Sequence, residues 1–244
     1  MFDITGKKVI MTGGATGLGF GMATALRRAG ASLAIIDISP QLYAAAESLG
    51  ACGIRADIST HEARVKAFQD ALEKLGGVDV FINCAGIQRR HKSEEFPMED
   101  WQLVLDVNLT ATFDFCQLAG NAMLAQGKGK IINVASMLSY FGGYTVPAYA
   151  ASKGGVAQLT KALSNEWASK GINVNAVAPG YMATDMNKKL IEDPDRNEKI
   201  LARIPAGRWG TPEDMGGVVV FLSSSASDYI SGAVIPVDGG YLGC

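Results

Sequence analysis

The stretch Thr12-Gly13-Gly14-Ala15-Thr16-Gly17-Leu18-Gly19 decides the fold of this chain. It follows the apolar run Lys8–Met11 and precedes the helical stretch Met22–Ala29. In a glycine-rich turn between a strand and a helix, backbone N–H groups approach a pyrophosphate at the positive end of the helix dipole. The glycines in T-G-x-x-x-G-x-G are more widely spaced than in the usual dinucleotide fingerprint. A tight turn with only a structural role could have the same glycine pattern. The flanking strand and helix favour a dinucleotide site, with contacts expected from Gly13, Thr16, Gly17, Leu18 and Gly19.

Short apolar runs alternate with helical stretches along most of the chain. Several runs are apolar on consecutive residues, as in strands that are covered on both faces. This alternation predicts a Rossmann-type α/β fold, with a doubly wound parallel sheet of about seven strands and helices on both faces. Residues 1–244 are expected to form a single NAD-binding domain, since no linker or repeat interrupts them. The expected strands are Lys8–Met11, Ser32–Asp37, Cys52–Ala56, Val78–Asn83, Lys130–Val134, Ile172–Val177 and Ala233–Val237.

Composition argues against several classes of function. The 22 basic and 24 acidic residues give a net charge of −2 without a long run of one sign, which disfavours nucleic acid or an anionic membrane as the partner. No apolar run reaches the length of a membrane span, and the first residues do not resemble a signal peptide. The four cysteines are widely separated and there are only two histidines, so we expect no metal site and free thiols in a reducing cytoplasm.

Two segments break the alternation of strands and helices, at about 136–147 and 180–203. Each follows an expected strand and carries small and polar residues. In open α/β sheets, ligands bind beyond the carboxyl ends of the strands. We therefore expect these two segments to be substrate loops.

Asp37 ends the second expected strand, eighteen residues after Gly19. A carboxylate at this place accepts hydrogen bonds from the adenosine ribose hydroxyls and repels a 2′-phosphate. Neither positions 14–16 nor 38–40 carry Arg or Lys to receive such a phosphate, so NAD is favoured over NADP. The alternative is a turn aspartate before Ser39-Pro40.

Tyr149 and Lys153 lie four residues apart at the start of an expected helix, on one face. A phenol ordinarily ionises near pH 10, and a neighbouring ammonium group stabilises the phenolate and lowers that value. Such a tyrosine can take a proton from an alcohol or return one to a ketone. A Tyr/Lys pair on a helix is also common as a plain surface pair. The expected position after the fifth strand favours the catalytic interpretation.

Together these motifs resemble the short-chain dehydrogenase/reductase family. The resemblance rests on 12–19, Asn83-Cys84-Ala85-Gly86, Asn108, Ser136, Tyr149-x-x-x-Lys153 and Pro179-Gly180, in the family's order along the whole chain. It implies that Tyr149 is the acid/base, that Ser136 hydrogen-bonds the reacting oxygen, and that Lys153 holds the nicotinamide ribose. It also implies that Asn108 keeps a water in a proton relay. Further cofactor contacts implied by the resemblance are Asp57, Ile58, Asn83, Ala85, Gly86, Pro179, Gly180, Met182 and Thr184.

One position departs from the family pattern. Cys84 stands where the family commonly has a second asparagine. That position is mainly structural in the family, so activity is still expected. Cys84 is either a thiol exposed to reagents in the site or a buried, inert cysteine, and we favour the second interpretation.

Four segments (130–139, 179–185, 204–210 and 225–229) resemble sugar-acid dehydrogenases of the 2-dehydro-3-deoxy-D-gluconate 5-dehydrogenase group. This implies hydride transfer at C5 of a sugar acid. A buried carboxylate needs a cation, preferably a bidentate one. Arg89 and Arg203 are the expected contacts, with Arg90 as a further candidate; a solvated loop or a helix-end charge would explain them equally well.

Other functions stay open at this point. One is a gluconate 5-dehydrogenase or other polyol dehydrogenase, and another is a non-enzymatic NAD-binding redox sensor. A third is a 3-oxoacyl carrier-protein reductase. Asp37 disfavours this third function, because such enzymes prefer NADPH. The family resemblance also implies a homotetramer, with the helical stretches Trp101–Gln126 and Ala150–Lys170 at an interface.

Overall fold

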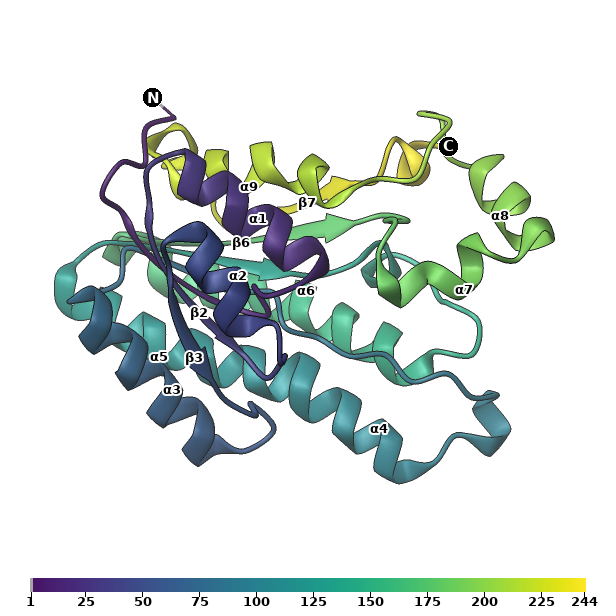
Figure 1. Cartoon of the computed structure of the whole chain (residues 1–244), viewed down its shortest axis with the longest axis horizontal. Coiled ribbons are helices and arrows are strands. Elements are labelled where there is room, and N and C mark those ends of the chain that lie inside the picture. Colours follow the sequence, from purple (N-terminus) through teal and green to yellow (C-terminus); the bar gives the residue numbers. More distant parts are fainter. Residues whose placement is uncertain (1) are drawn as a thin grey trace.

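Seven parallel strands form one sheet through the middle of the molecule, in the order β3-β2-β1-β4-β5-β6-β7 (Figure 1). The computed structural model describes residues 2–244. The parallel sheet confirms the expected α/β fold, and every expected strand is present with ends shifted by at most two residues. The strands are β1 (Lys8–Thr12), β2 (Ser32–Asp37), β3 (Cys52–Arg55), β4 (Val80–Asn83), β5 (Gly129–Val134), β6 (Ile172–Pro179) and β7 (Val234–Val237).

Helices cover both faces of the sheet (Figure 1). One face carries α1 (Gly17–Arg28), α2 (Leu42–Leu49) and α9 (Gly216–Ser223). The other face carries α3 (His61–Leu75), α4 (Met98–Leu105), α5 (Ala111–Gln126) and α6 (Pro147–Trp167). The chain reverses its direction of strand addition between β1 and β4. The carboxyl ends of strands at such a switch point are where an open sheet leaves a crevice for a ligand.

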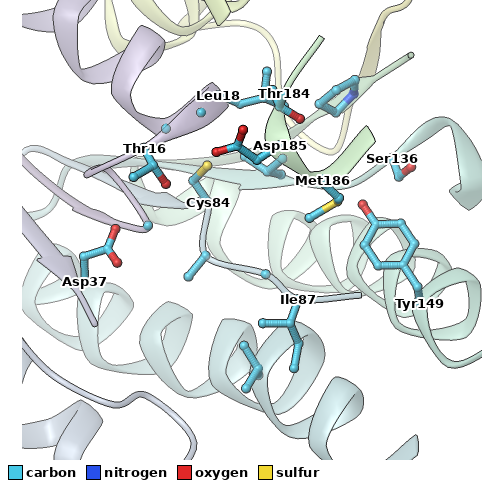
Figure 2. A pocket seen from close by; sticks show the side chains of 18 of the residues that line it. Thr16, Leu18, Asp37, Cys84, Ile87, Ser136, Tyr149, Thr184, Asp185 and Met186 are labelled. Atoms are coloured by element: carbon cyan, nitrogen blue, oxygen red, sulfur yellow. The ribbon is translucent and has the colours of Figure 1, made fainter. Parts of the chain in front are cut away.

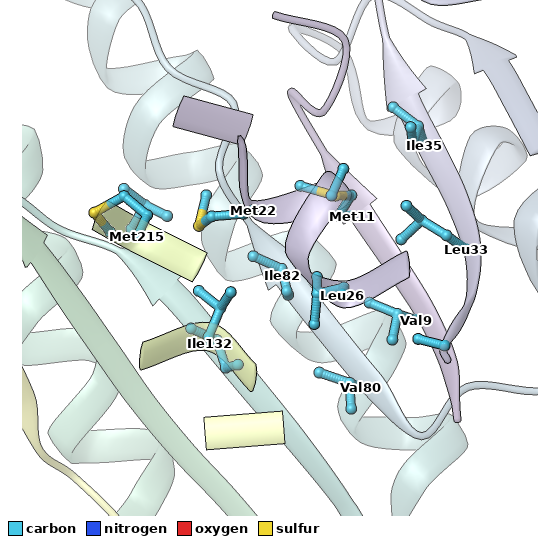
Figure 3. Close-up of a cluster of buried hydrophobic side chains, with 14 of the residues drawn as sticks. Val9, Met11, Met22, Leu26, Leu33, Ile35, Val80, Ile82, Ile132 and Met215 are labelled. Atoms are coloured by element: carbon cyan, nitrogen blue, oxygen red, sulfur yellow. The ribbon is translucent and has the colours of Figure 1, made fainter. Parts of the chain in front are cut away.

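The two hydrophobic cores lie on opposite faces of the sheet because successive side chains of a strand point in opposite directions. Val9 and Met11 of β1 pack in one core with Met22 and Leu26 of α1 (Figure 3). Ile10, between them in sequence, packs in the other core. All five side chains are fully buried. This two-sided burial explains why the strand sequences are apolar on consecutive residues.

The sequence S-x-x-E at Ser59–Glu62 resembles a capping box, but the structure places the cap one residue later. Helix α3 begins at His61, and the Thr60 hydroxyl accepts the hydrogen bond from the Ala63 amide at 3.4 Å. The Ser59 amide instead donates to the Asp57 carboxylate at 3.0 Å, in a turn that precedes the helix.

Two other segments differ from the expectation. The stretch expected as one helix over Trp101–Gln126 consists of α4 and α5 joined by one π-helical turn, Asp106–Thr110. The expected loop 180–203 contains two short helices, α7 (Lys188–Ile191) and α8 (Pro194–Leu201), which extend beyond the sheet in Figure 1. Within residues 2–244, no helix is both long and apolar enough to span a bilayer.

Candidate active site

A cavity of about 530 Å³ lies at the carboxyl ends of the strands, where the switch point predicts it. Its walls come from the turn after β1, the ends of β2 and β3, the turn after β4, the end of β5, the start of α6 and the segment after β6. In Figure 2, Asp37 and Tyr149 lie at opposite ends of this cavity. The cavity is therefore long, with an acidic group at one end and a phenol at the other.

The glycine-rich turn brings main chain to the floor of the cavity. Gly13 has a φ of +68°, and a Cβ there would lie 2.7 Å from the Ala85 Cα in the turn after β4. A Cβ on Gly19 would lie 1.8 Å from the Gly13 carbonyl oxygen. Only glycine fits at either position. Thr16 precedes α1 without a side-chain hydrogen bond to the helix, and the first turn of α1 has no acidic residue. The first N–H groups of α1 thus suit an anion such as a pyrophosphate.

At the acidic end, Asp37 is held by backbone amides. Its Oδ2 accepts a hydrogen bond from the Ala15 amide at 3.0 Å, and its Oδ1 accepts one from the Ser39 amide at 2.9 Å. Each carboxylate oxygen has a second lone pair, so both keep acceptor capacity toward the cavity. The turn interpretation of Asp37 and the ligand interpretation are therefore compatible, because the same carboxylate closes the turn and lines the cavity.

At the other end, Tyr149 on α6 faces Ser136 at the end of β5 (Figure 2). Burial raises the pKa of the Tyr149 phenol above its ordinary value. The hydrogen bond with Ser136 and the positive charge of Arg90 act in the opposite direction and lower this pKa. The Ser136 hydroxyl also accepts the Leu138 amide at 3.1 Å, which fixes its position at the start of a short 3-10 turn. At neutral pH, Tyr149 is a neutral phenol that can donate a proton.

Lys153, one helical turn after Tyr149, is 4% exposed. Its Nζ donates to the Val134 carbonyl at 2.6 Å and lies 5.8 Å from the centre of the Tyr149 ring. Burial lowers the pKa of Lys153 from 10.5 to about 8. Burial raises the pKa of the neighbouring Cys84 thiol to about 12, so Cys84 is a neutral thiol and not a reactive thiolate.

Asn83 and Asn108 are buried beside the cavity rather than in its wall. The Asn108 amide exchanges two hydrogen bonds with the Ile87 main chain, at 2.8 and 2.9 Å, and donates to Ser152 on α6 at 3.1 Å. Asn83 donates to Asn133 of β5 at 2.9 Å. These contacts tie the turn after β4 to the sheet and to the helix that carries Tyr149.

The arginines expected to hold a carboxylate take different places. Arg89 lines the cavity, and its Nε lies 3.3 Å from Asp100, which also pairs with His91 at 2.6 Å. Arg203 is outside the cavity wall, with its guanidinium carbon 4.4 Å from the centre of the Tyr241 ring.

Arg90 is close to the reaction end of the cavity. Burial lowers the pKa of Arg90, and so does a second cation, Arg196 of α8, while the phenols of Tyr181 and Tyr149 raise it. Arg90 and Arg196 are both exposed and lie outside the cavity wall, but the charge of Arg90 acts on Tyr149 and that of Arg196 acts on Arg90. Arg196 was not a candidate from the sequence.

Comparison with known proteins decides the family. The family model described as Enoyl-(Acyl carrier protein) reductase matches residues 13–242. The 2-dehydro-3-deoxy-D-gluconate 5-dehydrogenase of Bacillus subtilis is 47% identical to this chain, over 99% of this chain and 96% of the relative. The chain belongs to the short-chain dehydrogenase/reductase family.

Solved members of the short-chain dehydrogenase/reductase family have the same fold. A protein from Agrobacterium tumefaciens, solved with bound NADP, has a TM-score of 0.93 and 46% identity, over 100% of this chain and 99% of that chain. A gluconate 5-dehydrogenase from Burkholderia cenocepacia, solved with NADP and tartrate, has a TM-score of 0.93 and 35% identity, over 100% and 98%. The relatives support a nicotinamide dinucleotide as the cofactor without separating NAD from NADP.

Most of the residues expected from the sequence line this cavity. Four of them are outside its wall: Asn83, Asn108, Arg203 and the further candidate Arg90. Those in the wall are Gly13, Thr16, Gly17, Leu18, Gly19, Asp37, Asp57, Ile58, Ala85, Gly86, Arg89, Ser136, Tyr149, Lys153, Pro179, Gly180, Met182 and Thr184.

The structure adds wall residues that sequence reasoning missed. Leu103 and Val107 come from α4 and the π-helical turn, and Asp185, Met186 and Asn187 come from the 3-10 turn before α7. The second group follows Thr184 directly, so its place after a strand end was a usable signal. The first group lies on helix surfaces that the sequence does not mark.

Proposed function

We propose that this chain is an NAD(H)-dependent oxidoreductase of a sugar acid, acting at C5 of 2-dehydro-3-deoxy-D-gluconate. The observation that carries the proposal is the grouping of Tyr149, Ser136 and Lys153 at one end of a dinucleotide-sized cavity whose wall also includes Arg89. The Bacillus subtilis relative of that name, 47% identical over almost the whole chain, supports the choice of substrate.

The proposed roles follow from the local chemistry. When bound, the cofactor supplies or accepts the hydride. In ketone reduction, the neutral Tyr149 phenol donates its proton to the carbonyl oxygen as that oxygen gains negative charge. Ser136, which hydrogen-bonds Tyr149, places the substrate oxygen. The Lys153 ammonium, fixed by the Val134 carbonyl, stabilises the phenolate that remains. Alcohol oxidation uses the same groups in reverse, with Tyr149 accepting the hydroxyl proton.

The preference for NAD over NADP is proposed from Asp37. Its carboxylate lines the cavity and keeps acceptor capacity for ribose hydroxyls. A 2′-phosphate at the same place would meet its negative charge, and the wall residues at the ends of β2 and β3 include no Arg or Lys. Two relatives were solved with NADP, so the ratio of the two activities is the quantity to measure.

We assign the substrate carboxylate to Arg90 first, with Arg196 beside it. Arg203 is held over Tyr241, and Arg89 shares Asp100 with His91. Arg90 is exposed and outside the cavity wall, but no ion pair within residues 2–244 engages its side chain, and a substrate carboxylate would offset the repulsion between Arg90 and Arg196. Arg89 remains a proposed contact because it lines the cavity.

The test is NADH oxidation with 2,5-diketo-3-deoxygluconate, compared with a neutral ketose of similar size. Loss of a charge-assisted hydrogen bond costs about 1.5–3 kcal/mol, so kcat/KM for the neutral ketose is expected to be at least about tenfold lower. Arg90→Gln should reduce kcat/KM for the acid and leave the neutral ketose unchanged. Equal rates for the two ketones in the wild type would refute the sugar-acid assignment.

Tyr149→Phe is the control for the chemistry. It keeps the ring and removes the proton, so it should abolish turnover while NADH binding, followed by fluorescence titration, stays within about twofold, since the phenol acts on the substrate oxygen. NADH binding by the wild type without turnover of any sugar-acid ketone would support a redox sensor instead.

A gluconate 5-dehydrogenase is the second candidate, favoured by the Burkholderia cenocepacia relative that was solved with tartrate, a hydroxy acid. Comparing 5-ketogluconate with the 3-deoxy substrate distinguishes the two. We also propose a homotetramer in the cytoplasm. The four cysteines are free in the described structure, which suits a reducing compartment.

A further inference from the structure

Tyr241 lies at the junction of three segments that are distant in sequence. It begins a 3-10 turn after β7, and its side chain is buried, with 4% of the residue exposed. Its ring stacks on Phe141 with centroids 5.8 Å apart and meets Tyr181 edge-on at 5.3 Å. The guanidinium of Arg203 covers the ring at 4.4 Å. Phe141 belongs to the segment 136–147, and Tyr181 and Arg203 belong to the segment 180–203.

Backbone hydrogen bonds fix the same junction. The Gly180 amide donates to the Val237 carbonyl at 2.9 Å, and the Ala206 amide donates to the Gly239 carbonyl at 3.0 Å. The Asp238 carboxylate accepts the amides of Gly240 and Leu242, each at 2.9 Å, and so closes the turn that carries Tyr241. The Tyr241 ring is therefore presented from a rigid turn.

Residues of this junction are next in sequence to wall residues at the end of the cavity that holds Ser136 and Tyr149. Met137, which packs in one apolar cluster with Tyr241, is the neighbour of Ser136 in sequence. Tyr181 follows Gly180, a wall residue, and its phenol is close enough to Arg90 to raise that residue's pKa. The Tyr241 ring is thus connected to Ser136 through Met137, and to the wall residue Gly180 through Tyr181.

The same contacts reach α8. Trp209 meets the Tyr181 ring edge-on at 5.4 Å, and its indole donates to Asn197 of α8 at 2.7 Å. Ile200 and Leu201 at the end of α8 pack against the cluster of Tyr241. Arg196 is on this helix, so its position beside Arg90 depends on the aromatic contacts.

We propose that Tyr241 is a positioning residue that couples the segments 136–147 and 180–203 and thereby sets the KM for the acid substrate. The proposal rests on the proposed function, since it takes these two segments to hold the substrate. Tyr241 is not in the cavity wall. Its effect is expected on the placement of Ser136, Arg90 and Arg196 relative to one another.

The experiment replaces Tyr241 and separates binding from chemistry. In the full-length protein, Tyr241→Ala is expected to raise the KM for 2,5-diketo-3-deoxygluconate about tenfold or more, since it removes two aromatic pairs and one cation–π contact. The dissociation constant of NADH, bound on the other side of the site, should stay within about twofold. Tyr241→Phe keeps the ring and should restore KM to within about threefold of the wild type. Tyr229→Ala removes a fully exposed ring and is the matched control.

A second measurement does not depend on the substrate. Hydrogen–deuterium exchange in Tyr241→Ala should become faster in both segments, 136–147 and 180–203, and should return to the wild-type rate in Tyr241→Phe. If Tyr241→Ala does not fold, judged by circular dichroism, Tyr241→Leu gives the same test with the volume retained.

The two proposals fail in distinguishable ways. A wild type without activity on sugar-acid ketones refutes the proposed function, and the exchange rates then decide the coupling alone. An active wild type with an unchanged KM in Tyr241→Ala, or faster exchange in only one segment, refutes the coupling. An increase in KM that Tyr241→Phe does not reverse also refutes it, because the ring would then not be the coupling element.

Discussion

Lys153 is buried and Tyr149 is half-buried, and the charged form of each is unfavourable in the folded chain. Burial raises the pKa of Tyr149 and lowers that of Lys153, so both shifts favour the neutral states. The Lys153 shift is the one that extends toward neutral pH. It therefore has a consequence for stability as well as for catalysis.

The first prediction concerns pH and Lys153. The folded chain releases the Lys153 proton near pH 8, whereas an unfolded chain keeps it to about pH 10.4. Between these values the unfolded state binds more protons. The Lys153 contribution to the free energy of unfolding therefore rises with pH, by up to about 3 kcal/mol in total. Below pH 8, Lys153 is charged in the folded chain, and burial of this charge lowers the free energy of unfolding by its full amount.

Urea unfolding of the wild type and of Lys153→Met, from pH 7 to 10, measures this contribution. The cysteines and tyrosines titrate in both proteins, so their effect cancels in the difference. The wild type should gain stability relative to Lys153→Met as the pH rises. A difference that is constant with pH would show that Lys153 is not destabilised by burial.

The second prediction concerns Asp37 and the cofactor. Asp37→Ala should lower the ratio of kcat/KM for NADH to that for NADPH by about tenfold or more, because like charges in close contact cost several kcal/mol. Asp57→Ala is the matched control, since Asp57 lines the cavity at the end of the neighbouring strand. It should weaken both cofactors alike. Steady-state kinetics with each cofactor measure both variants, and an unchanged ratio in Asp37→Ala would exclude Asp37 as the ribose ligand.

For single residues, the sequence predicts those that belong to a motif and misses those that only the fold brings together. Tyr149 and Lys153 are four residues apart, so helix geometry alone places them. Arg90 and Arg196 are more than a hundred residues apart, and the charge of Arg196 acts on Arg90 from α8, a helix in a stretch that the sequence suggested only as a loop. The neighbouring sequence does not distinguish Arg90 from Arg89, because the difference between them is an ion pair of Arg89 with Asp100.

Helix α1, which follows the glycine-rich turn, packs closely against the main chain just before its neighbour α9. A Cβ on Gly21 of α1 would lie 2.5 Å from the Pro212 carbonyl oxygen, just before α9. Gly217 on α9 has no atom within 4 Å of the same position. Both glycines are in α-helices, but only at Gly21 would an added Cβ collide with a neighbouring segment.

The third prediction uses this matched pair. Gly21→Ala should lower the free energy of unfolding by about 1–3 kcal/mol, because backbone at Pro212 must shift. Gly217→Ala should raise it by up to about 1 kcal/mol through helix propensity. Denaturant unfolding of both variants gives the two values. Equal effects would mean that α1 accommodates the extra methyl group without moving.

The elements themselves were largely predictable, because a strand buried on both faces and an amphipathic helix have different apolar patterns. The π-helical turn Asp106–Thr110 was not, since its extra residue follows from the contacts of Asn108 with Ile87 and Ser152. The cap of α3 was also misplaced, because Asp57 holds Ser59 in a separate turn. Both cases depend on contacts that a local pattern does not contain.

For the whole molecule, the fourth prediction concerns assembly. The proposed tetramer places α5 and α6 at an interface, and Phe113 on α5 is 45% exposed in the single chain. Phe113→Asp should give a smaller species than the wild type, because a buried, unpaired carboxylate opposes association. Light scattering after size-exclusion chromatography measures the mass. Tyr43→Asp, at another exposed aromatic on α2, should leave the mass unchanged. Loss of mass in both variants would show that the effect is not specific to α5.

The strand order has a consequence for synthesis of the chain on the ribosome. β1 pairs with β2 on one side and with β4 on the other, and β4 follows β2 by roughly 40 residues. At about 5–20 residues per second, translation of that interval takes roughly 2–8 s. Throughout this time one edge of β1, with fully buried Val9, Ile10 and Met11 in the finished protein, has no partner strand. During this interval the nascent chain is exposed to aggregation through that edge, and a chaperone would protect it there.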